Sequence, residues 1–270
     1  MIPELFKGLL DDAAVFPPGL MPLPEAVAAH ERHLASPYAD IIGPLVLAAP
    51  ALAELGSVEF ALAVTAPAGP TQLPEVFARA GNRLAALEIA VPEGMSLAEF
   101  FTAVGGLEAP VFVEIPRDER RAEVIETCVK TGHHAKFRTG GVTSGMFPEE
   151  AELAAAIGAT VRAGVAFKAT AGLHHAIRNT DPVTGFEQHG YLNVLVATEA
   201  ALAGAGDAEL AAVLANRDAA EIAARTSTVD PATREWFRSF GTCSIVEPLT
   251  ELAGLGLVPA AVAAGEGVTA

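Results

Sequence analysis

The sequence has few aromatic residues, few cysteines and no long hydrophobic run, and each shortage excludes a class of protein. Aromatic residues make up 6% of the 270 residues, so alanine, valine and leucine must fill the core, which suits parallel strands buried on both faces. The two cysteines, Cys128 and Cys243, match no metal-ligand spacing and indicate a reducing compartment. No run approaches ~20 apolar residues, and no basic segment leads into an apolar one at the N-terminus. We therefore expect a cytoplasmic protein without a membrane span or signal peptide.

Basic residues are also scarce. The chain has 17 Lys and Arg against 33 Asp and Glu, a formal net charge of −16. A surface this acidic repels phosphate backbones and anionic lipids, which argues against nucleic-acid and membrane-surface partners. Any local cluster of basic residues is correspondingly more informative.

Short apolar runs alternate with segments of helical periodicity, which predicts βαβ units and a parallel sheet. The predicted strands are Ala13–Phe16, Ile41–Ala48, Glu59–Thr65, Ala85–Val91, Val111–Ile115, His134–Arg138, Ala166–Thr170 and Thr242–Val246. The predicted helices between them are Pro24–Ala35, Ala51–Leu55, Leu73–Ala80, Leu97–Val104, Arg120–Thr131, Glu149–Ala163 and one from Pro248. Eight alternating strands predict an α/β fold, a (β/α)8 TIM barrel forming a single domain over 1–270, since such barrels need roughly 250 residues. An open doubly wound sheet is the main competitor.

The interval 179–240, between the seventh and eighth strands, is longer than one helix requires. We expect a helical insertion there, with helices at Tyr191–Ala203, Ala208–Leu214 and Asp218–Arg225. It could form a lid or an oligomer contact, which leaves a homodimer open, or an extra helical layer on the side of the barrel. From Gly265 onward we expect an irregular tail.

Two strand ends carry an unusual set of cations. Strand periodicity places Lys136 and Arg138 on one face of the sixth strand, and Lys168 and Thr170 on one face of the seventh. Neighbouring strands lie about 4.8 Å apart, so two desolvated lysines there would push one pKa down. A neutral lysine amine attacks carbonyl carbons and forms a Schiff base. The competing interpretation is that each lysine is a solvated strand end or pairs with Glu114.

The stretch Lys136-Phe-Arg-Thr139-Gly140, followed by a helix and Lys168-Ala-Thr170-Ala-Gly172, resembles the paired lysine segments of the deoxyribose-phosphate aldolases, which are class I aldolases. The eighth strand, Phe240-Gly-Thr-Cys-Ser244, is similar to the Gly-Thr-Ser-Ser turn of that family. The resemblance covers 134–178 and 240–246. It implies that Lys136 is the Schiff-base lysine and Lys168 its electrostatic partner, and it adds Thr139, Thr170 and Ser244 as substrate-binding residues.

The chain also departs from that family. Ala90, in Glu88-Ile-Ala90, stands where the family carries a proton-relay Asp, so Glu88, Glu114 or the Asp11–Asp12 pair would have to substitute. Glu247 lies beside the amino end of the last helix, where its charge would repel a phosphate. The machinery therefore fits the family better than the phosphorylated substrate does.

Further candidates lie near other strand ends. Glu114 is expensive to bury without a cation, which makes it the preferred general acid/base or lysine partner. Asp12 could reach the barrel mouth, and Arg138 and Arg178 could hold an anionic group of the substrate. Each of these three could equally have a structural role in a turn or a surface ion pair.

The histidines support a second hypothesis. His174 and His175 follow the seventh strand at the active face, where they could contact substrate or, with Glu114, bind a divalent metal. No compact metal-binding signature supports the metal, so we predict neither a metal nor a cofactor. The alternatives are thus a Schiff-base lyase or isomerase for a small anionic or carbonyl substrate, and a metal-assisted or non-catalytic barrel that binds an anionic metabolite.

Overall fold

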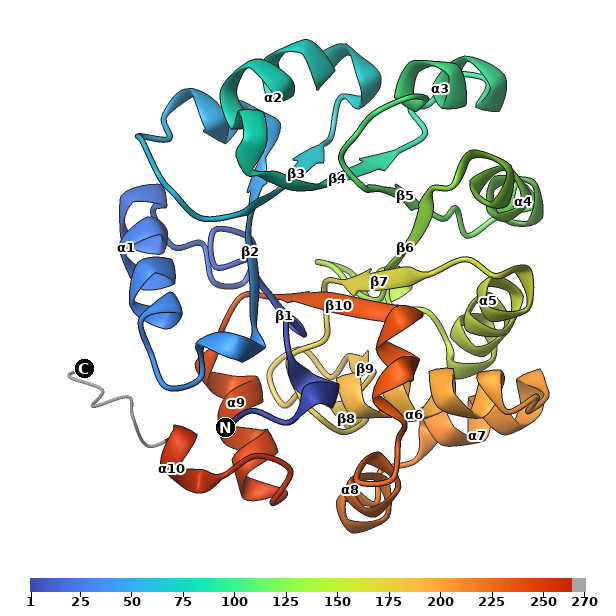
Figure 1. Ribbon diagram of the computed structural model, residues 1–270. Coiled ribbons are helices and arrows are strands. Elements are labelled where there is room, and N and C mark those ends of the chain that lie inside the picture. Colours follow the sequence, from blue (N-terminus) through green and yellow to red (C-terminus); the bar gives the residue numbers. More distant parts are fainter. Residues whose placement is uncertain (264–270) are drawn as a thin grey trace.

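A closed barrel of parallel strands surrounded by helices forms the centre of the computed structural model (Figure 1). The structure describes residues 1–263, and the tail predicted from Gly265 onward lies outside them. The barrel strands are β1 (Leu10–Asp12), β2 (Ile42–Ala48), β3 (Leu62–Ala66), β4 (Leu84–Ala90), β5 (Val111–Glu114), β6 (His134–Arg138), β7 (Phe167–Thr170) and β10 (Phe237–Thr242). They pair in chain order, and β10 closes the ring between β7 and β1. The fold is therefore the predicted α/β architecture with a closed eight-stranded parallel barrel.

The helices follow the strands at nearly the predicted positions. They are α1 (Leu23–Leu34), α2 (Leu73–Ala80), α3 (Leu97–Val104), α4 (Arg121–Thr131), α5 (Glu150–Ala163), α6 (Tyr191–Leu202), α7 (Asp207–Ala215), α8 (Ala219–Thr226), α9 (Val246–Gly254) and α10 (Ala260–Ala263). The α3 helix begins with a capping box. The Ser96 side chain accepts a hydrogen bond from the Glu99 backbone N–H, and the Glu99 side chain accepts one from the Ser96 backbone N–H. Among the described residues, no helix combines the length and apolar character that crossing a bilayer requires.

The predictions for the first and last strands were wrong. The first strand is Leu10–Asp12, earlier than predicted, and it pairs in register with Phe240–Thr242 of the last strand. Consecutive aspartates indicated a turn, because an isolated buried carboxylate is costly. The barrel places a partner against each of them, so a strand can carry both.

The segment between β7 and β10 begins with a two-stranded antiparallel sheet, which was not predicted as part of the helical insertion. Strands β8 (Asn179–Thr180) and β9 (Glu187–Gln188) form it. Helices α6, α7 and α8 follow where they were predicted, and α7 packs against α5 and α6 while α8 packs against α6. Figure 1 shows α7 and α8 on the outside of the barrel beside these helices.

The barrel interior has a small apolar layer with the polar groups above it. Val46, Ala63, Ala86 and Phe112 form a cluster separate from the large core between strands and helices. Above it, Lys136 of β6 is in register with Lys168 of β7 and with Glu114 of β5. The two alanines of the apolar layer leave room inside the ring for these long charged side chains.

Candidate active site

Two lysines lie inside the barrel, as strand parity predicted. The sequence contains four lysines, and of these Lys136 is 5% exposed and Lys168 is 1% exposed. Lysine is almost never buried unless it is paired. The carboxylates that face the two ammonium groups therefore decide what the pair can do.

Lys168 is held between two carboxylates deep in the barrel. Its Nζ donates to Oδ2 of Asp11 and to Oε1 of Glu88, both at 2.5 Å. The Ser239 hydroxyl donates to the same Asp11 oxygen at 2.6 Å. Gly43 makes room for this carboxylate, because a Cβ at that position would lie 2.2 Å from Asp11 Oδ1. Burial lowers the pKa of Lys168, but Asp11 and Glu88 outweigh it and hold this pKa above its ordinary value.

The pKa values of the two carboxylates around Lys168 shift in opposite directions, although burial acts to raise both. Burial raises the pKa of Asp11 above its ordinary value. Lys168 acts to lower this pKa, but one ammonium group does not offset the lost hydration. Burial also acts to raise the pKa of Glu88, but Lys168 and Lys136 together bring it down to about 2. Glu88 contacts two cations and Asp11 contacts one, which accounts for the difference.

Lys136 is also flanked by two carboxylates. Its Nζ lies 3.3 Å from Oε2 of Glu88 and 3.1 Å from Oε2 of Glu114. Arg138 Nε donates to Oε1 of Glu114 at 3.1 Å. Burial acts to raise the pKa of Glu114, but Lys136 and then Arg138 hold it below its ordinary value.

These six side chains form an interior ion row in which the charges alternate. The row runs in the order Asp11, Lys168, Glu88, Lys136, Glu114 and Arg138. The expectation that two neighbouring lysines would repel and that one would lose its proton omitted Glu88, which lies between them. From the sequence, Glu88 is only one of several candidates to substitute for the missing relay carboxylate. The available signal was a glutamate within the apolar strand Leu84–Ala90.

A cavity of about 1040 Å³ opens above the ion row at the carboxyl ends of the strands. Glu88, Lys136, Glu114 and Arg138 contribute to its wall, whereas Lys168 and Asp11 are not part of the lining. Only one of the two buried lysines is thus accessible to a molecule in the cavity. This is the end of the barrel where TIM-barrel enzymes place their catalytic residues.

Several residues predicted to bind substrate line this cavity. They are Arg138, Thr170, His174, His175 and Ser244. The Nδ1 of His174 lies 3.5 Å from Sγ of Cys243, and burial lowers the pKa of this histidine. The Nδ1 of His175 lies 2.6 Å from Oε1 of Glu251.

Three predicted substrate contacts lie outside the cavity lining. Asp12 is buried, with Oδ2 at 2.9 Å from Nδ1 of His30 on α1. Thr139 is buried and donates its hydroxyl to the Ala171 carbonyl at 2.6 Å. Strand parity separates Asp12 from Asp11, and it is Asp11 that enters the ion row.

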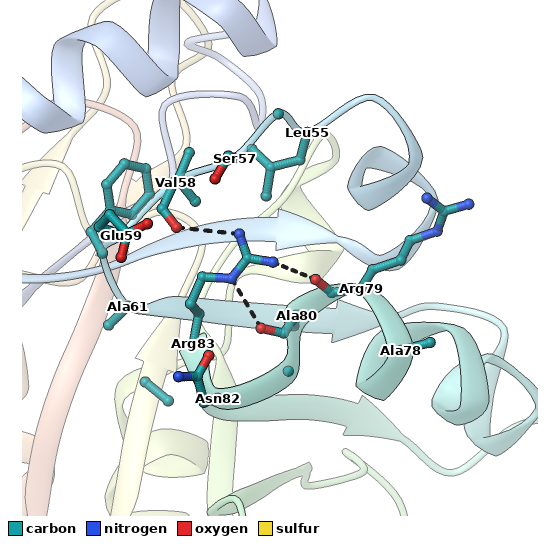
Figure 2. Close-up of a pocket in the computed structure, with 14 residues that line it drawn as sticks. Leu55, Ser57, Val58, Glu59, Ala61, Ala78, Arg79, Ala80, Asn82 and Arg83 are labelled. Carbon is teal, nitrogen blue, oxygen red and sulfur yellow. Dashed lines mark hydrogen bonds between the residues drawn. The ribbon is translucent and has the colours of Figure 1, made fainter.

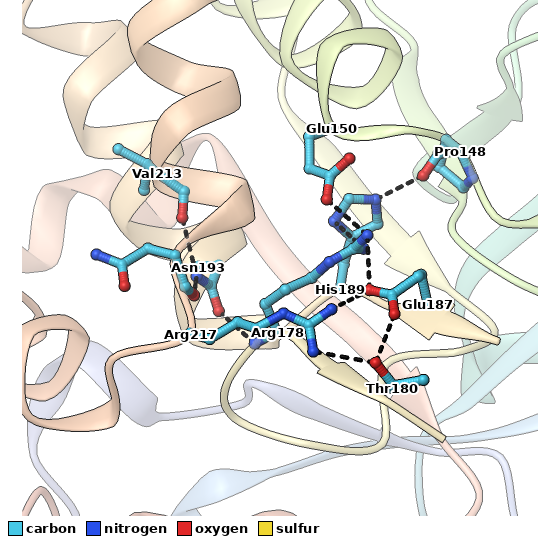
Figure 3. Close-up of polar contacts among 10 residues, drawn as sticks. Pro148, Glu150, Arg178, Thr180, Glu187, His189, Asn193, Val213 and Arg217 are labelled. Carbon is cyan, nitrogen blue, oxygen red and sulfur yellow. Dashed lines mark hydrogen bonds and ion pairs between the residues drawn. The ribbon is translucent and has the colours of Figure 1, made fainter. Parts of the chain in front are cut away.

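Arg178 is the third of these residues. Its guanidinium lies 2.6 Å from Glu150 and 3.3 Å from Glu187 in a network at the β8–β9 sheet (Figure 3). His189 lies beside it, and burial lowers the pKa of His189 to about 4. Both acidic partners of Arg178 are already in place, so this arginine holds the sheet against α5 instead of receiving a substrate.

A second cavity, of about 790 Å³, lies beside the amino ends of β3 and β4. Arg83 donates to the carbonyls of Ala80, Val58 and Arg79, as Figure 2 shows. The guanidinium is therefore occupied by backbone groups. Residues at the amino end of a barrel generally contribute to stability, whereas the active site lies at the carboxyl end. The cavity above the ion row is therefore the candidate active site.

The metal-binding alternative finds no ligand set in the part of the chain that the structure describes. Over residues 1–263, no group of three or more His, Cys, Asp or Glu side chains is arranged to hold an ion. Comparison of the chain with protein-family models, with curated proteins and with solved structures gave no match. The case for a function therefore depends on the site itself.

Proposed function

We propose that this protein is a class I aldolase-like lyase or isomerase that forms a Schiff base between Lys136 and a small carbonyl substrate. The observation that carries the proposal is the position of Lys136. It is a buried lysine that lines the cavity, and a carboxylate that also lines the cavity lies 3.1 Å from its Nζ. Nucleophile and proton acceptor are thus adjacent before any substrate enters.

The ion pairs of Lys136 require a proton transfer before attack. In the resting site, the ammonium group cannot act as a nucleophile, so Glu114 first accepts a proton from Nζ. The neutral amine then adds to the carbonyl carbon, and the protonated Glu114 returns its proton to the carbinolamine oxygen, which leaves as water. The resulting iminium retains the positive charge of Lys136 and its attraction to Glu88. Entry of the substrate expels water from the cavity, which favours the transfer because the neutral pair needs less hydration.

Lys168 acts in this proposal as a positioning residue. It is absent from the cavity lining and stays protonated, because Asp11 and Glu88 hold its pKa above the ordinary value. Its ammonium group binds one oxygen of Glu88 while Lys136 contacts the other. Without Lys168, the full charge of Glu88 would act on Lys136 alone. The pair thus keeps the roles of nucleophile and electrostatic partner.

The iminium withdraws electrons from the neighbouring carbon of the substrate, which permits carbon–carbon cleavage or enolisation. His174 lines the same cavity and, with its lowered pKa, is a neutral imidazole that can accept a proton there. We interpret 179–240 as the helical insertion of the barrel. The turn between β8 and β9 brings Asp181, Thr184 and Phe186 to the cavity wall.

The test is reductive trapping followed by mapping of the modified residue. The protein is incubated with borohydride and a panel of aldehydes and 2-oxo acids, and peptides are analysed by mass spectrometry. We expect the added mass on Lys136, with none at that peptide in Lys136→Met. Lys130→Met is the matched control, since Lys130 lies on the surface in an ion pair with Glu126. Absence of an adduct at Lys136 with every carbonyl would refute the proposal.

A further inference from the structure

We propose that the cavity selects uncharged carbonyl compounds with an apolar chain and rejects phosphorylated or carboxylated ones. This inference rests on the proposed Schiff-base function and names its substrate class. Three independent features of the cavity support it: the balance of charges, the covering of the glycine turns and the composition of the lining on the β1–β4 side.

The cations of the cavity are already paired. Lys136 contacts two carboxylates, and Arg138 contacts Glu114. Asp181 and Glu247 add further carboxylates to the lining, so four acidic side chains face two basic ones there. Lys168 and Asp11 beneath them cancel one another. A substrate anion would therefore enter a cavity with excess negative charge and would have to displace Glu114 to find a cation.

Apolar side chains cover the glycine turns after β6 and β7. Such turns bind anions when their backbone N–H groups are open to a ligand. The ring of Phe147 lies so close to two of them that a Cβ would be 2.7 Å from it at Gly140 and 2.8 Å at Gly172. At Gly141, the Met146 sulfur would lie 2.4 Å from a Cβ. Gly141 and Gly172 still contribute to the cavity lining, but the apolar side chains packed against these turns reduce the access of a phosphate to their backbone.

Most of the lining on the β1–β4 side of the cavity is apolar. This side contributes Phe16, Val46, Ala48, Ala66, Pro67 and Ala90, with Thr65 and Glu88 as polar members. The roof on the other side includes Phe147, whose ring centroid lies 5.5 Å from that of Phe186. A substrate with its carbonyl carbon at Lys136 can place an apolar chain against the β1–β4 side. Burying that chain contributes roughly 25 cal/mol per Å² of apolar surface to binding.

The first experiment compares pentanal with succinate semialdehyde, two aldehydes of similar length that differ by a terminal carboxylate. Reductive labelling of Lys136 is followed by mass spectrometry as a function of aldehyde concentration. We expect half-maximal labelling by pentanal at a concentration about tenfold or more below that of succinate semialdehyde, because Asp181 and Glu247 in the cavity lining repel the terminal carboxylate. More efficient labelling by succinate semialdehyde, or by glyceraldehyde 3-phosphate, would overturn the inferred substrate class and leave the Schiff base intact.

A second experiment separates the substrate class from the covalent chemistry. Saturation-transfer NMR measures binding of 4-phenylbutan-2-one and of 3-phenylpropanoate, which have similar shapes, to the Lys136→Met variant. We expect the ketone to bind and the carboxylate to bind more weakly. Equal or tighter binding of the carboxylate overturns the inference. Selective binding of the ketone without labelling of Lys136 in the native protein supports the cavity specificity and refutes the Schiff base.

The rim carboxylates provide a matched variant. In the double variant Asp181→Asn with Glu247→Gln, the excess negative charge is removed while the ion row remains intact. Labelling of Lys136 by succinate semialdehyde should approach that by pentanal. Unchanged discrimination in this variant would show that charge repulsion in the cavity is not its source.

Discussion

Replacing Glu88 by glutamine tests the centre of the ion row through the dependence of stability on pH. The pKa of Glu88 is lowered from 4.5 to about 2 because two ammonium groups contact its carboxylate. A group with a depressed pKa in the folded state contributes stability above its unfolded pKa and loses it as the pH falls through the folded value. At about 1.4 kcal/mol per pKa unit, this shift corresponds to about 3 kcal/mol at pH 7.

The assay is urea unfolding of the native protein and of Glu88→Gln at several pH values. We expect the variant to be about 3 kcal/mol less stable at pH 7, with the gap falling to about half at pH 3 and vanishing below the folded pKa. Glu126→Gln, which removes a surface partner of Lys130, should leave the midpoint unchanged. Equal stability of Glu88→Gln and native protein at pH 7, or a gap independent of pH, would refute the electrostatic account.

Three further substitutions test other parts of the site. Gly43→Ala should lose roughly 1–3 kcal/mol in urea unfolding because its Cβ would strike the Asp11 carboxylate, whereas Gly56→Ala, with no atom within 4 Å, should not. Glu114→Gln should slow reductive labelling of Lys136, the proposed nucleophile, by about 10²-fold, the usual effect of losing a general acid/base, and quenched time courses of labelling measure this rate. Lys168→Met should cost about 3–5 kcal/mol by leaving two buried carboxylates without their cation, and adding Asp11→Asn should recover part of that loss in the same assay.

The sequence predicted the barrel because its apolar periodicity alternates cleanly over most of the chain. Strand β6 has the predicted bounds, His134–Arg138, and helices α2 and α3 also begin and end as predicted. The failures were β1 and β10, whose polar residues break the apolar pattern. Their charged and hydroxyl side chains are balanced across the barrel by residues distant in sequence, such as Lys168 opposite Asp11. Local periodicity contains no information about such partners.

The candidate site could be predicted to the extent that strand parity determines it. Parity placed Lys136 and Lys168 inside the ring, and both are there. It could not choose between Asp11 and Asp12, because the predicted start of the first strand lay beyond both residues. A shift of one residue reverses the face of a strand. Arg178 directly precedes strand β8, which was not predicted, so the direction of its side chain could not be inferred.

The position of Glu88 explains why two similar lysines are suited to different roles. An isolated pair of lysines would compete to lose a proton, and either could become the nucleophile. Glu88 binds both, and Asp11 adds a second carboxylate to Lys168 within a part of the barrel that the cavity does not reach. Lys168 therefore keeps its proton, whereas Glu114, the second carboxylate of Lys136, meets the cavity and can be neutralised when a substrate displaces water. In the proposed function, this order of charges favours Lys136 as the nucleophile, because its carboxylate partner Glu114 lines the cavity whereas Asp11 does not.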